Sequence, residues 1–233
     1  MPRLSRLPPS MRSRRWRLLM RRRALASEIR SVLPLVPLVL ALLAGCATHE
    51  DGQPVVPSAL SSKVRQVDDS GRTLPFQTSH SRRWNGANDG TVFEPCTAVG
   101  LEELARLSID PTTATDAAGT DGQTLRGCRW RYITGKHSGW SIAQFVGNSA
   151  SLAADKAKFR SGDDIWLADL SINGRVVGLH RSAQLADCDT YVQSGRAGVH
   201  TVAMYVGPTP PPPSEICDRA LAFTRATISK MPL

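Results

Sequence analysis

Four cysteines, Cys96, Cys128, Cys188 and Cys217, are the residues with the most defined chemistry in the body of this sequence. In an exported domain an even number of cysteines argues for disulfides, and four cysteines allow three connectivities. We favour the sequential pairing, Cys96–Cys128 with Cys188–Cys217. Each bond would then close a loop of about thirty residues, clamp one end of the fold and contribute about 3–4 kcal/mol. A metal or redox site is the alternative, but no Cys-x-x-Cys occurs and no histidine lies at ligand spacing from a cysteine.

Other side chains that could do acid–base chemistry are scattered along the chain. Asp163-Asp164 could form a carboxylate pair, but adjacent residues on a turn point apart. His137, His180 and His200 could each meet a serine or an aspartate in the fold, although surface or packing roles are the simpler interpretation. The sequence lacks Gly-x-Ser-x-Gly, Ser-x-x-Lys and His-Glu-x-x-His. We therefore expect no enzymatic activity, no cofactor and no metal.

Three tryptophans, Trp130, Trp140 and Trp166, fall on expected strands. Core packing is the default interpretation for such residues. The alternative is that they line an apolar pocket, because aromatic side chains are favoured at binding sites.

Cys46 carries a different signal from the other cysteines. It follows an apolar run, 32–43, and closes the sequence Leu43-Ala44-Gly45-Cys46. The apolar run is too short for a stable membrane span, which needs roughly 20 residues. A basic segment, an apolar segment and a small-residue cleavage zone make a signal peptide, and its end resembles the bacterial lipobox. That resemblance implies a lipid on the Cys46 thiol and cleavage before it. A plain signal peptide is the alternative.

The charge of the chain is concentrated in this presequence. Of 29 basic and 20 acidic residues, residues 1–45 hold ten arginines and one acid, which leaves 19 of each sign in residues 46–233. The sequence has no basic stripe after residue 45, so we exclude a nucleic-acid partner. The true start could be Met20, which would give a signal of ordinary length.

Three segments follow from these patterns: a signal peptide over 1–45, a flexible tether over 46–82 and one domain over 83–233. The tether is polar, turn-rich and without periodicity. In the domain we expect an α+β fold, with an antiparallel sheet of about five or six strands and helices packed on one face. We expect helices over 97–107, from Ser149 or Ser151 to about residue 160, and over 214–230. We expect a loop over 112–124, and strands over 128–134, 140–146, 165–172, 175–180, 188–193 and 199–206. Asn173-Gly174 predicts a tight hairpin.

A family resemblance rests on short motifs around the cysteines. Phe93-Glu94-Pro95-Cys96 enters a helix, Gly127-Cys128-Arg129-Trp130 begins a strand, and two later cysteines precede a helix that ends at Met231-Pro232. Together with the Cys46 motif, this pattern resembles the actinobacterial lipoproteins that carry the domain of unknown function numbered 3558, over residues 85–232. The resemblance implies an envelope lipoprotein with paired disulfides. It implies no established activity and supplies no catalytic residues.

Three hypotheses of function remain. The first is a binding or scaffolding module, tethered by lipid to the extracytoplasmic face of the cell membrane, whose partner is an envelope protein or other envelope component. The second is a carrier of a lipid or small apolar ligand, with Trp130, Trp140 and Trp166 around a pocket. The third is an envelope hydrolase whose site leaves no motif in the sequence.

Overall fold

An eight-stranded antiparallel sheet dominates the computed structural model, which describes residues 64–133, 138–160 and 162–233. By contacts the chain divides into two units, Met1–Pro54 and Val55–Leu233, and all described residues belong to the second. In spatial order the strands are β1 (Ile109–Asp116), β2 (Arg126–Tyr132), β3 (Trp140–Asn148), β8 (Ala197–Tyr205), β7 (Asp187–Ser194), β6 (Arg175–Ser182) and β4 (Asp164–Trp166), while β5 (Leu170–Ile172) pairs separately with β6.

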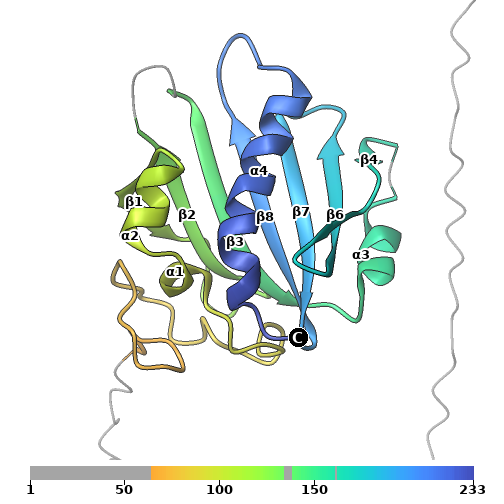
Figure 1. The fold of residues 1–233 in the computed structure, drawn as a ribbon. Helices are drawn as coiled ribbons and strands as arrows, with labels where there is room; N and C mark the ends of the chain where they lie inside the picture. The colour runs from red at the N-terminus through yellow and green to blue at the C-terminus, as the bar shows by residue number, and fades with distance from the viewer. Residues whose placement is uncertain (1–63, 134–137, 161) are drawn as a thin grey trace, which may run out of the picture. The chain divides into compact units, whose positions relative to one another are not determined.

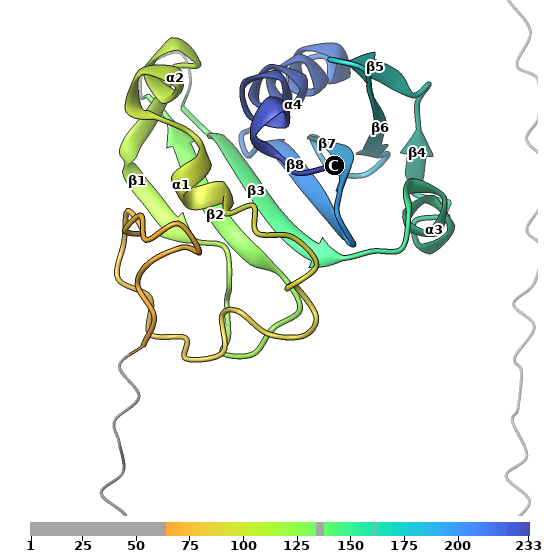
Figure 2. The same ribbon diagram turned by 60° about the horizontal axis from the view of Figure 1, so that its bottom comes forward.

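The helices lie on both faces of this sheet. α1 (Pro95–Ala98), α2 (Leu101–Arg106) and the long α4 (Pro213–Thr227) share one face, and the sheet curves around α4 (Figures 1 and 2). α3 (Leu152–Lys158) lies on the other face. Neighbouring residues of a strand point to opposite faces. On β8, Thr201 points toward α4, because the Gln144 side chain donates both to Thr201 and to Thr227 of α4. The preceding residue, His200, faces Asp155 of α3 instead. We call the face turned away from α4 the outer face.

The core lies between the sheet and α4. Trp130 of β2 packs on Phe223 of α4 with 5.5 Å between ring centroids, and both side chains are almost fully buried. Polar side chains in this layer hydrogen-bond to one another, as burial favours: the hydroxyls of Thr190 and Thr224 lie 2.6 Å apart. A short 3-10 turn, Ile228–Lys230, follows α4.

Two disulfides fix the inner layer. Cys96 at the start of α1 is joined to Cys128 of β2, and Cys188 of β7 is joined to Cys217 of α4. This is the sequential pairing favoured above. Each bond joins a helix to a strand: the first holds α1 on β2, and the second holds α4 on β7.

The expectation of five or six strands is wrong, because the sheet has eight. The predicted loop 112–124 overlaps β1, an edge strand that contains Pro111 and whose register shifts between Asp110 and Thr115. An edge position tolerates proline because one side of the strand needs no ladder bond. The predicted strand 165–172 is two short strands, β4 and β5. The predicted helix 97–107 is likewise two, broken at Gly100, which precedes α2.

Asn173 and Gly174 form the predicted hairpin turn. Both have positive φ, 51° and 76°, as a two-residue turn of this kind requires. The C-terminal helix begins one residue before the expected cap Ser214, at Pro213, because proline suits the first turn of a helix, where its missing N–H costs nothing.

The domain also begins earlier than residue 83. Residues 64–82, which the sequence assigns to the tether, fold against the sheet: Leu74 is buried in the core, and the Thr78 hydroxyl donates to Asp116 at the end of β1 at 2.8 Å. The predicted signal peptide, Cys46 and the rest of the tether lie outside the described residues. Within the described part, no helix combines the length and the apolar character needed to cross a membrane.

Candidate binding groove on the outer face

A groove of about 630 Å³ runs along the outer face over β2, β3 and β8. Its position follows from strand alternation, because the inward side chains of these strands, such as Trp130 and Ile142, fill the core and leave the alternate residues outside. We call it the outer-face groove. It is lined by Arg129, Arg131, Gly139, Trp140, Ser141, Ala143, Phe145, Val202, Met204 and Val206.

The strand registers order the groove by polarity. Arg129 of β2 lies opposite Ala143 of β3, Ala143 lies opposite Val202 of β8, and Val202 lies opposite Asp189 of β7. The next row repeats the order with Arg131, Ser141, Met204 and Asp187. Side chains directly opposite each other lie within about 5 Å. The groove therefore has cations along one side and a largely apolar floor, and carboxylates on β7 lie beyond its other side.

The carboxylates of β7 and the arginines of β2 differ in whether their charged groups have hydrogen-bond partners within the protein. Asp187 accepts from the Ser182 backbone N–H and Asp189 from the ring of His200, so both carboxylates are engaged. Arg129 and Arg131 are exposed, and within the described residues neither has a carboxylate at ion-pair distance. The unengaged charge of the groove is therefore positive.

His200 lies beyond the end of the groove, between two carboxylates and two aromatic rings. Its Nδ1 is 2.9 Å from Asp189 Oδ2, its Nε2 is 3.6 Å from Asp155 Oδ1, and its ring stacks on Phe145 with 5.3 Å between centroids. Tyr191 meets the ring edge-on. Burial alone would lower the pKa of His200, but the charges and hydrogen bonds of Asp189 and Asp155 outweigh it and raise the pKa to about 10. At neutral pH, His200 is a buried cation.

The tryptophans predicted as pocket lining do not share a pocket. Trp130 is buried against α4, and Trp140 is buried between Tyr132, Tyr205 and the guanidinium of Arg219, touching the groove only at its end. Trp166 lies at the far end of the sheet, half-buried, where its ring meets His180. Alternation directs Trp130 and Trp140 into the core beneath α4, while Trp166 lies beside α3, so the three tryptophans lie in separate surroundings.

The other residues that the sequence suggested for acid–base chemistry do not come together in one site among the described residues. Asp164 lies 2.9 Å from His180, whereas Asp163 accepts from Gln184, so the adjacent carboxylates do point apart. His137 lies outside the described residues. Among the described residues, no group of three or more histidines, cysteines or acids is arranged to hold a metal ion.

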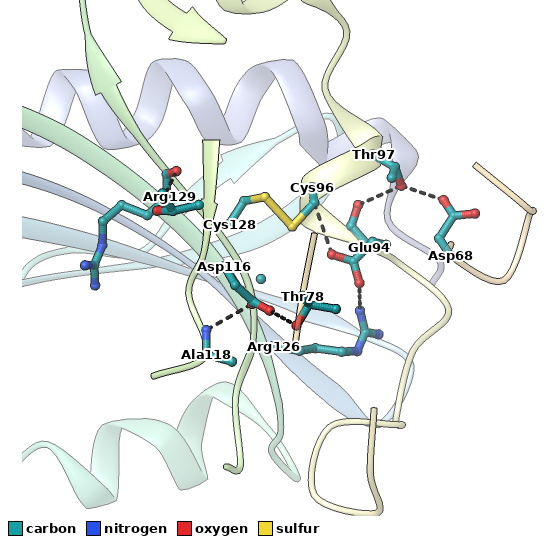
Figure 3. Close-up of a disulfide and its surroundings, with 12 residues drawn as sticks. Asp68, Thr78, Glu94, Cys96, Thr97, Asp116, Ala118, Arg126, Cys128 and Arg129 are labelled. Carbon is teal, nitrogen blue, oxygen red and sulfur yellow. Dashed lines mark hydrogen bonds and ion pairs between the residues drawn. A yellow bond between two sulfur atoms is a disulfide. The ribbon is translucent and has the colours of Figure 1, made fainter. Parts of the chain in front are cut away.

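A buried ionic cluster beside the first disulfide was not anticipated. Glu94, before α1, accepts from both Arg83 and Arg126, and the three side chains are at most 1% exposed. Figure 3 shows Glu94 turned toward Arg126 next to the Cys96–Cys128 bond. Arg126 also donates to backbone carbonyls at 2.7–3.1 Å, those of Asn88, Thr91 and Phe93. Every charged group has its partners, which marks the cluster as structural.

The alternation of small, apolar and basic residues on the outer face was visible in the sequence. What the sequence did not show is that β3 and β8 are neighbours, and only that pairing places Phe145 and Ala143 beside Val202 and Met204. Each strand's pattern of outward residues can be read from the sequence. The groove could not be, because it forms only where two strands about sixty residues apart in sequence lie side by side.

Comparison with known proteins gives a family for this fold. Residues 41–230 match the family described as Protein of unknown function (DUF3558). The chain belongs to this family. No curated protein and no solved structure matches the chain. This match confirms the DUF3558 part of the resemblance drawn from the cysteine motifs, and the family description names no activity.

Proposed function

We propose that this DUF3558 protein is an envelope lipoprotein, anchored through Cys46 at the extracytoplasmic face of the cell membrane, and that its folded domain is a binding module. The anchor is supported by the basic and apolar segments before Leu43-Ala44-Gly45-Cys46. Two disulfides in the folded domain support an oxidising compartment. The near-zero net charge of residues 46–233 gives the domain no general attraction to nucleic acid.

The outer-face groove carries the binding role. Its floor of Ala143, Phe145, Val202 and Met204 is half-buried, so an apolar chain laid there would remove further apolar surface from water. The guanidinium groups of Arg129 and Arg131 stand along one side without hydrogen-bond or ion-pair partners among the described residues, and guanidinium groups suit carboxylates and phosphates. The ligand class that fits both features is an anionic amphiphile, an apolar chain that ends in a carboxylate or phosphate.

The geometry favours binding over hydrolysis. A hydrolase of the expected kind needs a histidine that can accept a proton near neutral pH. His200 does lie in a cleft beside carboxylates, but its pKa of about 10 keeps it protonated. His180 lies between the rings of Phe159 and Trp166 and faces Asp164. Neither histidine is paired with a serine hydroxyl in the hydrogen bonds of the described residues.

Native mass spectrometry of the gently extracted full chain tests this role. The protein is offered dodecyl phosphate or dodecyltrimethylammonium, which share an apolar chain and differ in charge. We expect a one-to-one complex with the phosphate and at least tenfold weaker binding of the ammonium compound. Met204→Glu, which places a carboxylate in the apolar floor, should abolish the complex. Arg129→Gln with Arg131→Gln should remove the preference for the anion.

The matched control is Val92→Glu, which makes the same kind of change at an exposed valine before α1, away from the groove. This variant should bind as the parent does. A parent protein that binds neither amphiphile, or binding that Met204→Glu and Val92→Glu affect equally while both stay folded, would contradict the groove as the binding surface. Capture of an envelope protein that Met204→Glu releases would instead favour the scaffolding role.

A further inference from the structure

A second cavity lies on the outer face beside His200, under α3. Its volume is about 210 Å³. Phe145 separates it from the outer-face groove and lines both. The other side chains that matter for its chemistry are Asp155, Lys158, Phe159, Asp189 and His200.

Two residues that line this cavity, Asp155 and Asp189, each have a buried carboxylate oxygen without a hydrogen-bond partner among the described residues. Asp155 and Asp189 each use one oxygen on His200, and the other oxygens, Asp155 Oδ2 and Asp189 Oδ1, are buried without a hydrogen bond from the described residues. The Asp155 side chain is 4% exposed. A buried acceptor without a donor costs about 1–3 kcal/mol, and more when it is charged. The wall of the cavity therefore lacks two hydrogen-bond donors.

The charges around the cavity identify the kind of donor. The negative charges of Asp155 and Asp189 are balanced by protonated His200 between them and by Lys158 at the rim. A cationic ligand would meet two cations already in place, and an anion would meet two carboxylates. A neutral ligand with hydroxyl donors satisfies the two oxygens without disturbing this balance.

The apolar walls add a second requirement. Phe145 is half-buried, with its ring stacked on His200, and Phe159 is 38% exposed beside His180. Both line the cavity, so a ligand held by the carboxylates must also present an apolar face. A sugar ring has both features, hydroxyl groups around its edge and C–H groups on its faces.

We propose that the cavity beside His200 binds a neutral sugar ring, with hydroxyl groups donating to Asp155 Oδ2 and Asp189 Oδ1 and a C–H face against Phe159. The site is distinct from the outer-face groove and does not depend on what the groove binds.

Solution NMR of the isotope-labelled full chain tests this proposal. The probes are methyl α-glucopyranoside, methyl α-mannopyranoside and methyl β-galactopyranoside, each titrated into the tens of millimolar, with n-butylammonium as the cationic comparison. We expect saturable shifts of the His200 ring and the Asp155 and Phe159 amides with at least one pyranoside. The same residues should respond little to butylammonium. A methylated maltotriose then distinguishes a free sugar from the end of a glycan: tighter binding than the single ring indicates a glycan.

Variants inside and outside the cavity distinguish specific pyranoside binding at this site from shifts that the sugar causes throughout the protein. Phe159→Ala changes a side chain at the cavity edge and should weaken binding severalfold while the fold is kept. Asp155→Asn replaces one acceptor oxygen with a donor and should weaken pyranoside binding at least tenfold. Asp163→Asn makes the same change on an exposed turn outside the cavity and should leave binding unchanged. If no pyranoside gives a saturable shift, if butylammonium binds in preference, or if both Phe159→Ala and Asp155→Asn bind as the parent does, the proposal is overturned.

Discussion

At the scale of single residues, the most unusual group in the domain is His200, a buried cation between Asp155 and Asp189. A pKa raised from 6.5 to about 10 means that the folded state holds a proton that the unfolded state releases above pH 6.5. The resulting stabilisation is fully present below pH 6.5 and is lost as the pH rises toward 10. Burial raises the pKa of the neighbouring Tyr191 above its usual value, so that phenol titrates above this range.

This argument predicts a pH dependence of stability. Between pH 6.5 and 10, the free energy of unfolding of the parent should fall relative to that of His200→Gln, by up to about 1.4 kcal/mol per pH unit. Below pH 6 the difference between the two proteins should be constant. Urea unfolding at a series of pH values measures it. Two curves that run parallel from pH 6 to 10 would show that His200 does not carry the charge inferred here.

Residue chemistry was only partly predictable from the sequence. The presence of disulfides followed from the even number of cysteines and the expected compartment, while the sequential pairing was one favoured choice among three connectivities. The environment of His200 did not follow, since Asp155 and Asp189 reach it from a helix and from a neighbouring strand. Trp130 and Trp140 were placed on the correct strands, but the face on which each lies depends on the position of α4.

At the scale of elements, the buried cluster of Arg83, Glu94 and Arg126 joins the N-terminal segment to the sheet. Arg126 begins β2, Glu94 precedes α1, and Arg83 also donates to Asp116 at the end of β1 at 3.1 Å. Ion pairs therefore link the N-terminal segment, the start of α1 and the first two strands of the sheet. Removing one member of a buried ionic group typically costs 3–5 kcal/mol.

Arg126→Met should accordingly lower the free energy of unfolding by about 3 kcal/mol or more. Loss of the Arg126 guanidinium removes one hydrogen bond to Glu94 and leaves three backbone carbonyls without their donor. Arg129→Met is the matched control, three residues along the same strand and exposed, and should change stability by less than about 0.5 kcal/mol. Chemical denaturation of both variants measures the difference. Equal, small losses would mean that the cluster does not hold these elements together.

Elements set by local sequence were the ones predicted well. The hairpin at Asn173-Gly174 was found because its turn needs two residues with positive φ, which the sequence itself supplies. α3 begins where Ser151 caps it, bonding the Ala154 N–H. β1 was missed because its pattern is irregular around Pro111 and because, among the described strands, it pairs with β2 alone. Residues 64–82 were assigned to the tether because their few apolar residues, such as Leu74, give no period.

At the scale of the whole molecule, we propose an anchor at Cys46 for a domain that is clamped by two disulfides and has a groove on the sheet face turned away from α4. Figure 2 shows how the sheet curves around α4 and leaves its outer face on the other side. The α+β class and the long C-terminal helix followed from the sequence, while the groove required the pairing of β3 with β8. Export is the premise common to all three, because it gives the disulfides their compartment and the groove its envelope ligands.

Intact-mass analysis and peptide mapping of the protein from its native membrane test this premise most directly. The account predicts a chain that begins at Cys46, carries a diacylglycerol thioether on that sulfur, and is found in the membrane fraction with the other four cysteines oxidised. Cys46→Ser should move the protein out of that fraction. A cytosolic chain that retains residues before Cys46, with a free Cys46 thiol and four reduced cysteines, would contradict the account.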